Sequence, residues 1–250
     1  MIALTLNGEQ IEAEEGSTVL EAATAHGVKI PTLCHHEGLQ PYGACRICIV
    51  EVSQRGRTKI ESSCTRPVEP GMEVQTDTEQ IRQYRKLIAE LLLARCPDSE
   101  RIKELAQEVG VAETRFPALD EDCVLCGLCV RACQDAIGAS AIAFANRGMD
   151  RKACAPFSIN SDSCIGCGAC AKVCPTGAIK VEDVGGKRYI RYFNTELELQ
   201  PCEECGAFFA TKRALAKTAQ DYPTRDELRG LCEACRRKHQ AASLQRHLVP

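Results

Sequence analysis

The sequence has few of the large side chains from which an extensive hydrophobic core is built. It contains no tryptophan, and aromatic residues make up 4% of its 250 residues. A chain of this length has room for about two domains of ordinary size. Because apolar burial is limited, such domains need a further source of stability. Disulfide bonds and bound metals are the two candidates.

Other absences exclude whole classes of protein. The N-terminus lacks the basic start and apolar stretch of a signal peptide, and no apolar run reaches the roughly 18 residues of a membrane span. A formal net charge of −3 gives no general basic surface for nucleic acid. We therefore expect a cytoplasmic protein with no membrane span and no nucleic-acid partner. In that reducing compartment, thiols stay reduced unless they bind metal.

Cysteine, by contrast, is abundant and grouped. The 18 cysteines form four sets of four and leave two over, Cys96 and Cys154. The sets are Cys34, Cys45, Cys48 and Cys64; Cys123, Cys126, Cys129 and Cys133; Cys164, Cys167, Cys170 and Cys174; and Cys202, Cys205, Cys232 and Cys235. Four thiolates are the ligand number of an iron–sulfur cluster or of a structural zinc. The sequence therefore predicts a metalloprotein with four centres.

Residues 1–78 are predicted to form a small module of strands and one helix. Apolar residues alternate over positions 2–6, and Asn7-Gly8 is a strong hairpin signal. A capping box of Thr18 and Glu21 opens a helix. This order of strand, hairpin, strand and helix, followed by a cysteine loop, resembles the start of a ubiquitin-like ferredoxin domain.

The expected ligands of a [2Fe-2S] cluster in this module are Cys34, Cys45, Cys48 and Cys64. Ten residues separate the first two ligands, unlike the four of plant-type ferredoxins. The stretch 34–52 resembles the [2Fe-2S] domain at the start of the large peripheral-arm subunit of respiratory complex I and of related subunits of iron and NAD-linked hydrogenases. Gly43 would let backbone amides approach the inorganic sulfides. A structural zinc is the alternative, and His35 and His36 are interpreted as exposed or as neighbours of the ligands.

Residues 79–118 are predicted to form a helical linker. One helix begins at a capping box of Thr76 and Glu79, and a second follows Pro97. The resembling proteins usually carry here an extra four-iron cluster held by one histidine and three cysteines. Because the linker has no histidine and a single cysteine, Cys96, we expect no such cluster and interpret Cys96 as a packed thiol.

Residues 119–185 contain the run Cys-x2-Cys-x2-Cys-x3-Cys twice. In two-cluster bacterial ferredoxins, each copy of this run supplies three local ligands and gives its fourth cysteine to the other cluster. The sequence therefore predicts two [4Fe-4S] clusters with crossed ligand sets. The first set is Cys123, Cys126, Cys129 and Cys174, and the second is Cys164, Cys167, Cys170 and Cys133.

Two further features of this segment bear on the clusters. Gly127, Gly166 and Gly168 keep the loops small enough for backbone amides to reach the cluster sulfurs. The insert 135–163 is longer than in a minimal ferredoxin and resembles the same region of the hydrogenase and complex I relatives. It contains Cys154, which we interpret as a spare thiol.

Residues 186–250 contain two Cys-x2-Cys knuckles, formed by Cys202 with Cys205 and by Cys232 with Cys235. Such knuckles each give two thiolates to a tetrahedral zinc, so a zinc-ribbon-like module is predicted. The spacer of 26 residues exceeds the usual length of about 15–20, and a further iron–sulfur cluster is the alternative. A terminal helix is expected to carry the basic run 236–238 as a solvated face. We expect a chain truncated after Pro201 to keep all three clusters.

The predicted fold class is α+β, with a [2Fe-2S] domain, a helical linker, a two-cluster ferredoxin domain and a zinc-ribbon-like module. The sequence has no Gly-x-Gly-x-x-Gly or Walker motif, so we expect no flavin or nicotinamide site and no catalytic residue. Three clusters of two types form a relay for single electrons. The expected function is that of a non-catalytic electron-transfer subunit between a flavin subunit that oxidises NAD(P)H and another redox site.

The resemblance also implies partners. They are an FMN-containing diaphorase-type subunit, a thioredoxin-like [2Fe-2S] subunit, and a terminal oxidoreductase subunit or ferredoxin. Residues 1–78 carry a net charge of −5 and residues 201–250 a net charge of +3, which indicates different neighbours for the two ends. A free-standing ferredoxin carrier and an iron–sulfur sensor that binds nucleic acid are the alternative functions.

Overall fold

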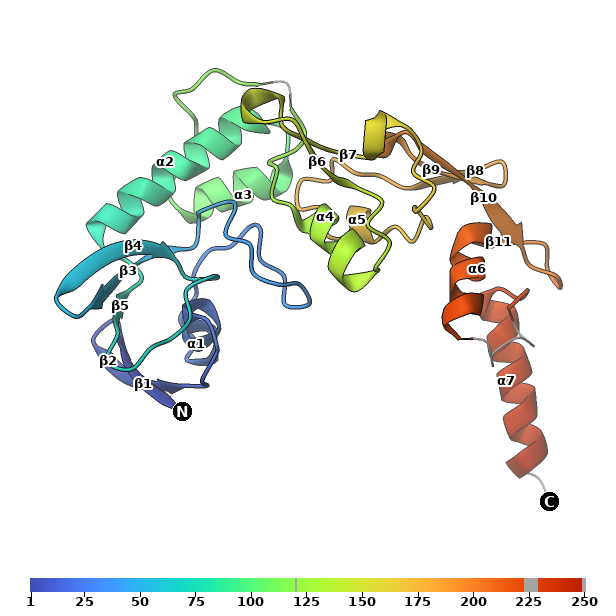
Figure 1. The fold of residues 1–250 in the computed structure, drawn as a ribbon, viewed down its shortest axis with the longest axis horizontal. Coiled ribbons are helices and arrows are strands. Elements are labelled where there is room, and N and C mark those ends of the chain that lie inside the picture. The colour runs from blue at the N-terminus through green and yellow to red at the C-terminus, as the bar shows by residue number, and fades with distance from the viewer. Residues whose placement is uncertain (120, 223–228, 249–250) are drawn as a thin grey trace. The chain divides into compact units, whose positions relative to one another are not determined.

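The computed structural model describes residues 1–119, 121–222 and 229–248 (Figure 1). The predicted zinc-ribbon-like module, 186–250, therefore includes some positions outside the described residues. The chain divides into two compact units. The first unit comprises residues 1–131 and 174–178, and the second comprises 132–173 and 179–250. Each unit is described by itself.

A five-stranded sheet forms the first part of the first unit, with strand order β2-β1-β5-β3-β4. Strands β1 and β5 run parallel, and the other neighbours are antiparallel. One helix, α1, belongs to the same part (Figure 1). The elements are β1 (Ile2–Leu6), β2 (Glu9–Ala13), α1 (Val19–Ala25), β3 (Ile49–Gln54), β4 (Arg57–Ser62) and β5 (Glu73–Gln75).

The core of this part follows from the period-two pattern of its strands. Leu4, Leu6 and Val74 are at most 3% exposed, and Val19 on α1 is buried against the same cluster of side chains. Alternate strand residues point to one face, which is why this pattern buries a continuous apolar layer. The predicted hairpin between β1 and β2 is confirmed. The capping box is confirmed as well, because the side chain of Thr18 and that of Glu21 each bond the backbone of the other.

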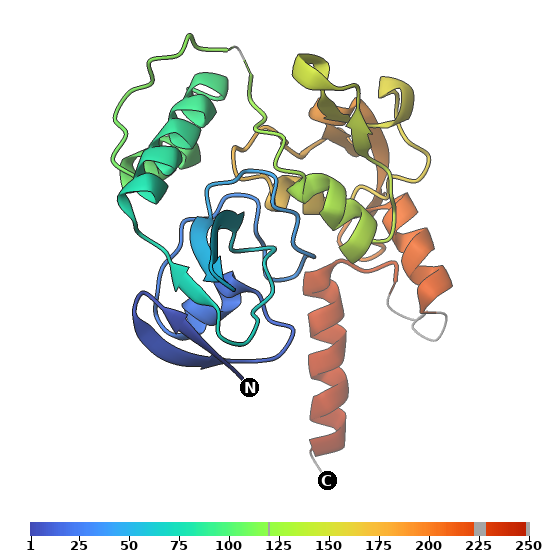
Figure 2. The same cartoon turned by 60° about the vertical axis from the view of Figure 1, so that its left-hand side comes forward.

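Two helices, α2 (Glu79–Arg95) and α3 (Glu100–Glu108), lie side by side after the sheet (Figures 1 and 2). Their inner faces bury a second apolar cluster that includes Leu33, Ile47 and Cys96. The predicted capping box at Thr76 is wrong, because Thr78 caps α2 by accepting a hydrogen bond from the backbone of Ile81. Thr76 is held instead by the side chain of Asn7, whose Oδ1 accepts its backbone N–H at 2.8 Å.

The second unit contains a four-stranded antiparallel sheet of order β11-β10-β9-β8, in which strands follow one another in chain order (strands labelled in Figure 1). A separate pair, β6 with β7, forms the insert between the cysteine runs. The elements are β6 (Ala143–Ala145), β7 (Lys152–Cys154), α5 (Ala169–Lys172), β8 (Glu182–Val184), β9 (Lys187–Ile190), β10 (Thr195–Pro201), β11 (Phe208–Thr211), α6 (Lys212–Asp221) and α7 (Glu233–Leu248).

Within residues 1–119, 121–222 and 229–248, no helix has both the length and the apolar character that crossing a membrane requires.

Candidate metal centres

The four cysteines expected to bind the [2Fe-2S] cluster come together in the first unit. Cys34, Cys48 and Cys64 are each 1% exposed, and Cys45 is partly buried. The Cys34 thiol is hydrogen-bonded to the thiols of Cys45 and Cys64, and the Cys48 thiol is hydrogen-bonded to the Cys64 thiol; none of the four forms a disulfide. The loop between α1 and β3 supplies three of these side chains, and the end of β4 is followed by the fourth.

The thiols of this group have strongly shifted acidities. Hydrogen bonds from Cys45 and Cys64 lower the pKa of Cys34 to about 2, and a hydrogen bond from Cys64 lowers the pKa of Cys48 to about 6. The same hydrogen bonds raise the pKa values of Cys45 and Cys64. A metal cluster binds thiolates rather than thiols, so this network holds Cys34 and Cys48 in the form that binds metal, whereas Cys45 and Cys64 must lose their protons when a cluster binds.

The loop around these cysteines is held close to them. Gly43 has φ +68°, and a Cβ atom there would lie 3.0 Å from Cγ2 of Thr65. The backbone N–H of Cys45 donates to the Cys34 sulfur at 3.5 Å. His36 is exposed and accepts a hydrogen bond from the backbone of Gly38 at 3.1 Å, and His35 is partly buried. Both histidines directly follow Cys34, the first expected ligand, in the sequence.

Two buried guanidinium groups contact the same loop. Arg85 of α2 donates to the carbonyl oxygens of Ile47 at 3.2 Å and Ile49 at 2.8 Å, and burial lowers the pKa of Arg85. Arg131 donates to the carbonyl oxygen of Cys34 at 2.6 Å. Neither residue was predicted from the sequence. The available signals were the helical spacing that puts Arg85 on the same face as Ile81 and Ala89, and a basic residue inside a cysteine run.

The first cysteine run contributes three thiols to the first unit. Cys126 and Cys129 are buried and Cys123 is partly buried, beside the short helix α4 (Leu128–Arg131). Cys174, from the second run, belongs to the same unit. Burial raises the pKa of Cys126 to about 11, and the charges of Cys123 and Cys174 contribute to the rise. These three thiols therefore lie close enough for their charges to interact, although 48 positions separate Cys126 from Cys174 in the sequence.

The second unit contains the other four cysteines of the two runs, Cys133, Cys164, Cys167 and Cys170. Burial raises the pKa of Cys170 to about 12, with further contributions from the charges of Cys167, Cys164 and Cys133. Cys133 accepts a hydrogen bond on sulfur from the backbone N–H of Ala141 at 3.3 Å. In each unit the structure thus places three cysteines of one run with one cysteine of the other.

Residues of the four-stranded sheet and of α6 hold the loop of the second run. Arg188 of β9 donates to the carbonyl oxygen of Gly166 at 2.8 Å, and Thr211 donates to that of Ile165. Arg213 of α6 donates to the carbonyl oxygen of Cys164 at 3.4 Å. These contacts were not predicted from the sequence, because the spacing of the cysteines does not indicate which downstream residues donate hydrogen bonds to the cysteine loop.

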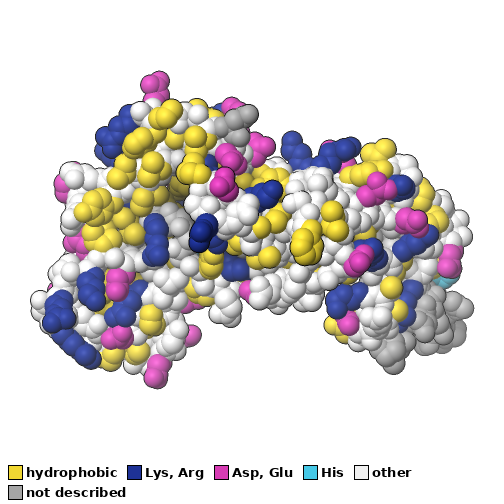
Figure 3. Space-filling view, turned by 45° about the horizontal axis from the view of Figure 1, so that its top comes forward, with side chains coloured by type: hydrophobic (Ala, Val, Ile, Leu, Met, Phe, Trp, Pro, Cys, Tyr) yellow, Lys and Arg dark blue, Asp and Glu magenta, His cyan; other side chains and the backbone are white. Residues whose placement is uncertain are grey.

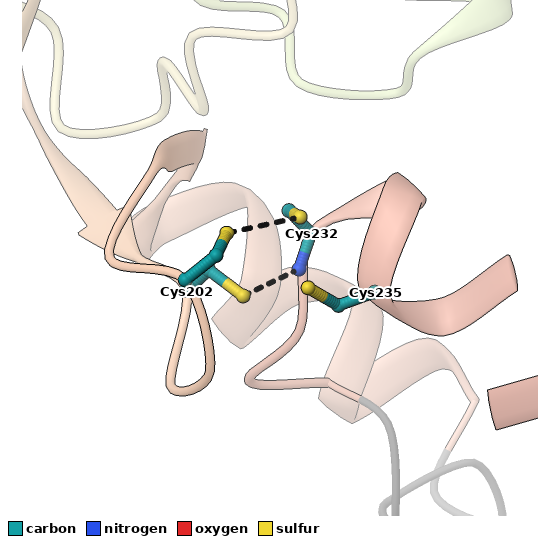
Figure 4. Close-up of side chains that lie close together, drawn as sticks. Cys202, Cys232 and Cys235 are labelled. Carbon is teal, nitrogen blue, oxygen red and sulfur yellow. Dashed lines mark hydrogen bonds between the residues drawn. The ribbon is translucent and has the colours of Figure 1, made fainter. Parts of the chain in front are cut away.

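The last four cysteines form the tightest group. The sulfur atoms of Cys202, Cys205, Cys232 and Cys235 all lie within 4.8 Å of one another. Figure 4 shows Cys202 facing Cys232 and Cys235 from the other knuckle, and the sulfurs of Cys205 and Cys232 are 3.6 Å apart. The backbone N–H of Cys232 donates to Cys202 at 3.3 Å and lowers the pKa of that thiol to about 6.

The size of each group can be compared with the metal expected there. A tetrahedral zinc with Zn–S bonds of about 2.3 Å places its sulfurs roughly 3.8 Å apart. The C-terminal group matches this spacing. Across the described residues, no group of cysteines in the runs or in the first module brings three ligand atoms within 4.8 Å, and a multi-iron cluster does hold its thiolates farther apart than a single ion does. The donor sets, all thiol, fit both kinds of centre.

Two family descriptions match parts of the chain. Residues 1–79 match the family described as "2Fe-2S iron-sulfur cluster binding domain". Residues 157–180, which contain the second run, match the family described as "4Fe-4S binding domain".

Individual proteins resemble a larger part of the chain. NADPH-Fe(3+) oxidoreductase subunit alpha of Geobacter sulfurreducens is 33% identical over 72% of this chain and 24% of that protein. The mitochondrial NADH-ubiquinone oxidoreductase 78 kDa subunit of Candida albicans is 31% identical over 71% of this chain and 28% of that protein. NADP-reducing hydrogenase subunit HndD of Solidesulfovibrio fructosivorans is 29% identical over 72% of this chain and 36% of that protein.

A solved structure is similar over most of its length. It is a chain of an NAD+-reducing [NiFe]-hydrogenase in the H2-reduced state, 32% identical, with a TM-score of 0.61 over 70% of this chain and 85% of that chain. The present chain spans about a quarter to a third of the length of the curated relatives named above. The chain belongs to the family of iron–sulfur proteins that includes the 78 kDa subunit of NADH-ubiquinone oxidoreductase and the related chains of NAD(P)-linked hydrogenases.

Proposed function

We propose that this chain is an electron-transfer subunit of a multi-subunit oxidoreductase located in the cytoplasm. It would relay single electrons between an FMN-containing subunit that oxidises NAD(P)H and another redox site. Iron–sulfur clusters, when bound, supply centres that accept and donate one electron at a time. The observation that carries the proposal is that three cluster-sized sets of thiols are gathered within one chain that has no nucleotide-binding motif.

The proposed [2Fe-2S] ligands are Cys34, Cys45, Cys48 and Cys64, in a ubiquitin-like domain of residues 1–78. Their mutual hydrogen bonds and burial support this set. The residues of the chain would bind the cluster through thiolates, and backbone amides such as that of Cys45 would stabilise its negative charge. A helical linker, 79–118, would buttress the site through Arg85.

The proposed [4Fe-4S] ligands are crossed between the runs in a ferredoxin domain of residues 119–185. One set is Cys123, Cys126, Cys129 and Cys174; the other is Cys164, Cys167, Cys170 and Cys133. The division of the chain into units supports the crossing, because Cys174 is grouped with the first run and Cys133 with the second. The electrostatic influence of Cys174 on Cys126 and of Cys133 on Cys170 supports it independently.

The proposed role of the C-terminal module, 186–250, is structural. Cys202, Cys205, Cys232 and Cys235 would bind one zinc ion and staple α7 to the loop after β10. The short distance between the Cys205 and Cys232 sulfurs favours a single ion over a further cluster. The partners proposed for the whole chain are a diaphorase-type FMN subunit, a thioredoxin-like [2Fe-2S] subunit and a terminal oxidoreductase subunit or ferredoxin.

A nucleic-acid-binding sensor is the less supported function. On the face drawn in Figure 3, lysine and arginine side chains are interspersed with aspartate and glutamate side chains. Within the terminal basic run, Arg237 is paired with Glu233 on the same helix. Both observations reduce the positive field that phosphate binding requires.

Two measurements test the proposal. Anaerobically prepared protein should contain about ten iron atoms and about one zinc per chain, from one two-iron site, two four-iron sites and one zinc site. Iron near fourteen without zinc would assign a cluster to the last four cysteines.

The chain alone should not oxidise NADH or NADPH, because it has no flavin to divide a hydride into single electrons. Mixed with its FMN subunit, its clusters should be reduced by a nicotinamide, and failure to do so would contradict the proposal.

A further inference from the structure

Arg131 joins two segments that carry different centres. It lies between Cys129 and Cys133 in the first run, at the end of α4. Its guanidinium donates to the carbonyl oxygen of Cys34 at 2.6 Å and to that of Gln40 at 2.5 Å. These two carbonyls belong to the loop that carries the first [2Fe-2S] ligands, more than 90 positions earlier in the sequence.

The environment of this guanidinium is unusual for a cation. Arg131 is 9% exposed, and among the ion pairs within the described residues it has no carboxylate partner. Its Nε is buried without a hydrogen-bond partner in the part of the chain that the structure describes. The ring of Tyr42 lies 5.4 Å from the guanidinium carbon. An arginine cannot lose its proton in a protein, so a full positive charge is buried here.

A buried charge is costly unless an opposite charge lies nearby. The carbonyl oxygens and the tyrosine ring supply only partial negative charge. A cluster held by four thiolates carries a net negative charge, and it would complete the neutralisation. The equivalent position of the second run, between Cys170 and Cys174, is Lys172, and its side chain is exposed. The run itself therefore does not require a buried cation at this place.

We propose that Arg131 is a positioning residue that holds the [2Fe-2S] site at a fixed separation from the centre of Cys123, Cys126, Cys129 and Cys174, and that its charge raises the reduction potential of the [2Fe-2S] cluster. This inference rests on the proposed ligand sets. The guanidinium fixes the separation between the two sites because its two NH2 groups bind two carbonyl oxygens of the [2Fe-2S] loop at once. The positive charge of Arg131 raises the reduction potential of the [2Fe-2S] cluster because reduction adds a negative charge to the cluster, and a nearby cation in a medium of low dielectric constant stabilises that charge.

The test uses the full-length chain, loaded anaerobically, with Arg131→Gln and Arg131→Lys. Arg131→Gln removes the charge, and Arg131→Lys keeps the charge but cannot bind both carbonyls as a fork. Arg82→Gln is the matched control, because it removes one positive charge from an exposed, ion-paired position of α2. The first readout is the iron content. The second is the midpoint potential of the [2Fe-2S] signal, measured in a potentiometric titration followed by electron paramagnetic resonance. The third is the magnetic coupling between the reduced [2Fe-2S] cluster and the reduced cluster of Cys123, Cys126, Cys129 and Cys174.

We expect Arg131→Gln to lower the reduction potential of the [2Fe-2S] cluster at unchanged iron content. It should also weaken the magnetic coupling between this cluster and the neighbouring four-iron cluster, or spread that coupling over a wider range of strengths. Arg131→Lys should restore the potential but not the coupling, and Arg82→Gln should change neither. Unchanged potential and coupling in both Arg131 variants would overturn the inference. If neither variant loads a [2Fe-2S] cluster that the parent chain does load, Arg131 is needed for folding and the positioning role is overturned. A parent chain without a [2Fe-2S] signal would instead contradict the proposed ligand set.

Discussion

At the scale of single residues, Gly166 shows how little space the loop of the second run has. Its φ is +69°, and a Cβ atom there would lie 2.6 Å from Cδ1 of Leu197 and 2.7 Å from Cγ2 of Thr211. We expect Gly166→Ala to displace the loop and to lower the iron content by about four atoms per chain. Backbone strain alone, of about 1–3 kcal/mol, would not do this.

A second glycine, Gly138, separates the effect of backbone strain from that of a steric clash at the added Cβ atom. Gly138 has the same φ of +69°, and no atom lies within 4 Å of the position that a Cβ atom would take there. Gly138→Ala should therefore keep its iron, since it introduces the strain without the collision. Equal iron loss in the two variants, measured by metal analysis after anaerobic preparation, would show that backbone strain and not the contact with Thr211 controls this loop.

Asp183 makes the same loop sensitive to pH. Arg188 donates to its two carboxylate oxygens at 2.8 and 2.7 Å, and this lowers the pKa of Asp183 below its ordinary value. Because the pKa is lower in the folded state, the pair adds stability above the unfolded pKa of about 3.9. That stability is lost as the pH falls through the folded pKa. Since Asp183 is partly exposed, the contribution should stay below about 1 kcal/mol.

The corresponding measurement is the rate of iron release from Asp183→Asn relative to the parent chain. We expect faster release from the variant at pH 7, because Arg188 is then held less firmly against Gly166. The difference should persist down to about pH 4 and shrink only as the pH falls further, below the unfolded pKa of about 3.9. Asp98→Asn, which removes an exposed carboxylate in the first unit, should behave like the parent at both pH values. A difference that grows on acidification would contradict the assigned sign.

At the scale of elements, the crossing of the two runs can be tested by pairs of substitutions. Cys174→Ala should remove about four iron atoms, and adding Cys123→Ala should remove no more, because both residues would serve one cluster. Cys174→Ala with Cys164→Ala should remove about eight. Cys154→Ala, outside both runs, is the control and should retain all iron. A local arrangement of ligands predicts the opposite result for the two pairs, so iron analysis decides between them.

The sequence predicted those elements whose signals are local. The hairpin at Asn7-Gly8 and the helix capped by Thr18 depend on neighbouring residues, and both were placed correctly. The cap of α2 was misplaced by two residues, because Asn7 binds Thr76 from a distant strand. No local pattern reveals such a contact. For the same reason the cysteine spacing indicated which thiols to group, but gave no indication that Arg131 or Arg213 would hold the loops around them.

The meander β8 to β11 illustrates the same limit. Its strands are short, and none of them was predicted from the sequence of residues 186–211. In the structure, β11 pairs with β10 through Leu199 and Thr211. That pairing carries Thr211 back to the carbonyl oxygen of Ile165. The element thus links the C-terminal module to the second cysteine run through contacts that spacing alone does not encode.

At the scale of the whole molecule, these contacts change what truncation should do. From sequence alone, a chain ending at Pro201 keeps all three clusters, since no cluster ligand follows that residue. The structure gives a reason to revise this prediction, because such a chain would lose β11, Thr211 and Arg213, which donate hydrogen bonds to the carbonyl oxygens of Ile165 and Cys164. We now expect truncation after Pro201 to lose the four-iron signal of the second unit.

A chain ending at Tyr222 provides the matched comparison. It keeps β11 and α6 and removes Cys232 and Cys235, so the proposed zinc site is lost while every described contact to the second run is retained. We expect it to hold about ten iron atoms and no zinc, and to bind its partner subunits less firmly than the full chain does. Iron analysis and partner pull-down of the two truncated chains separate the roles. Full iron in the chain ending at Pro201 would show that β11 and α6 do not support the cluster, and normal partner binding by the chain ending at Tyr222 would remove the docking role of the metal-stapled module.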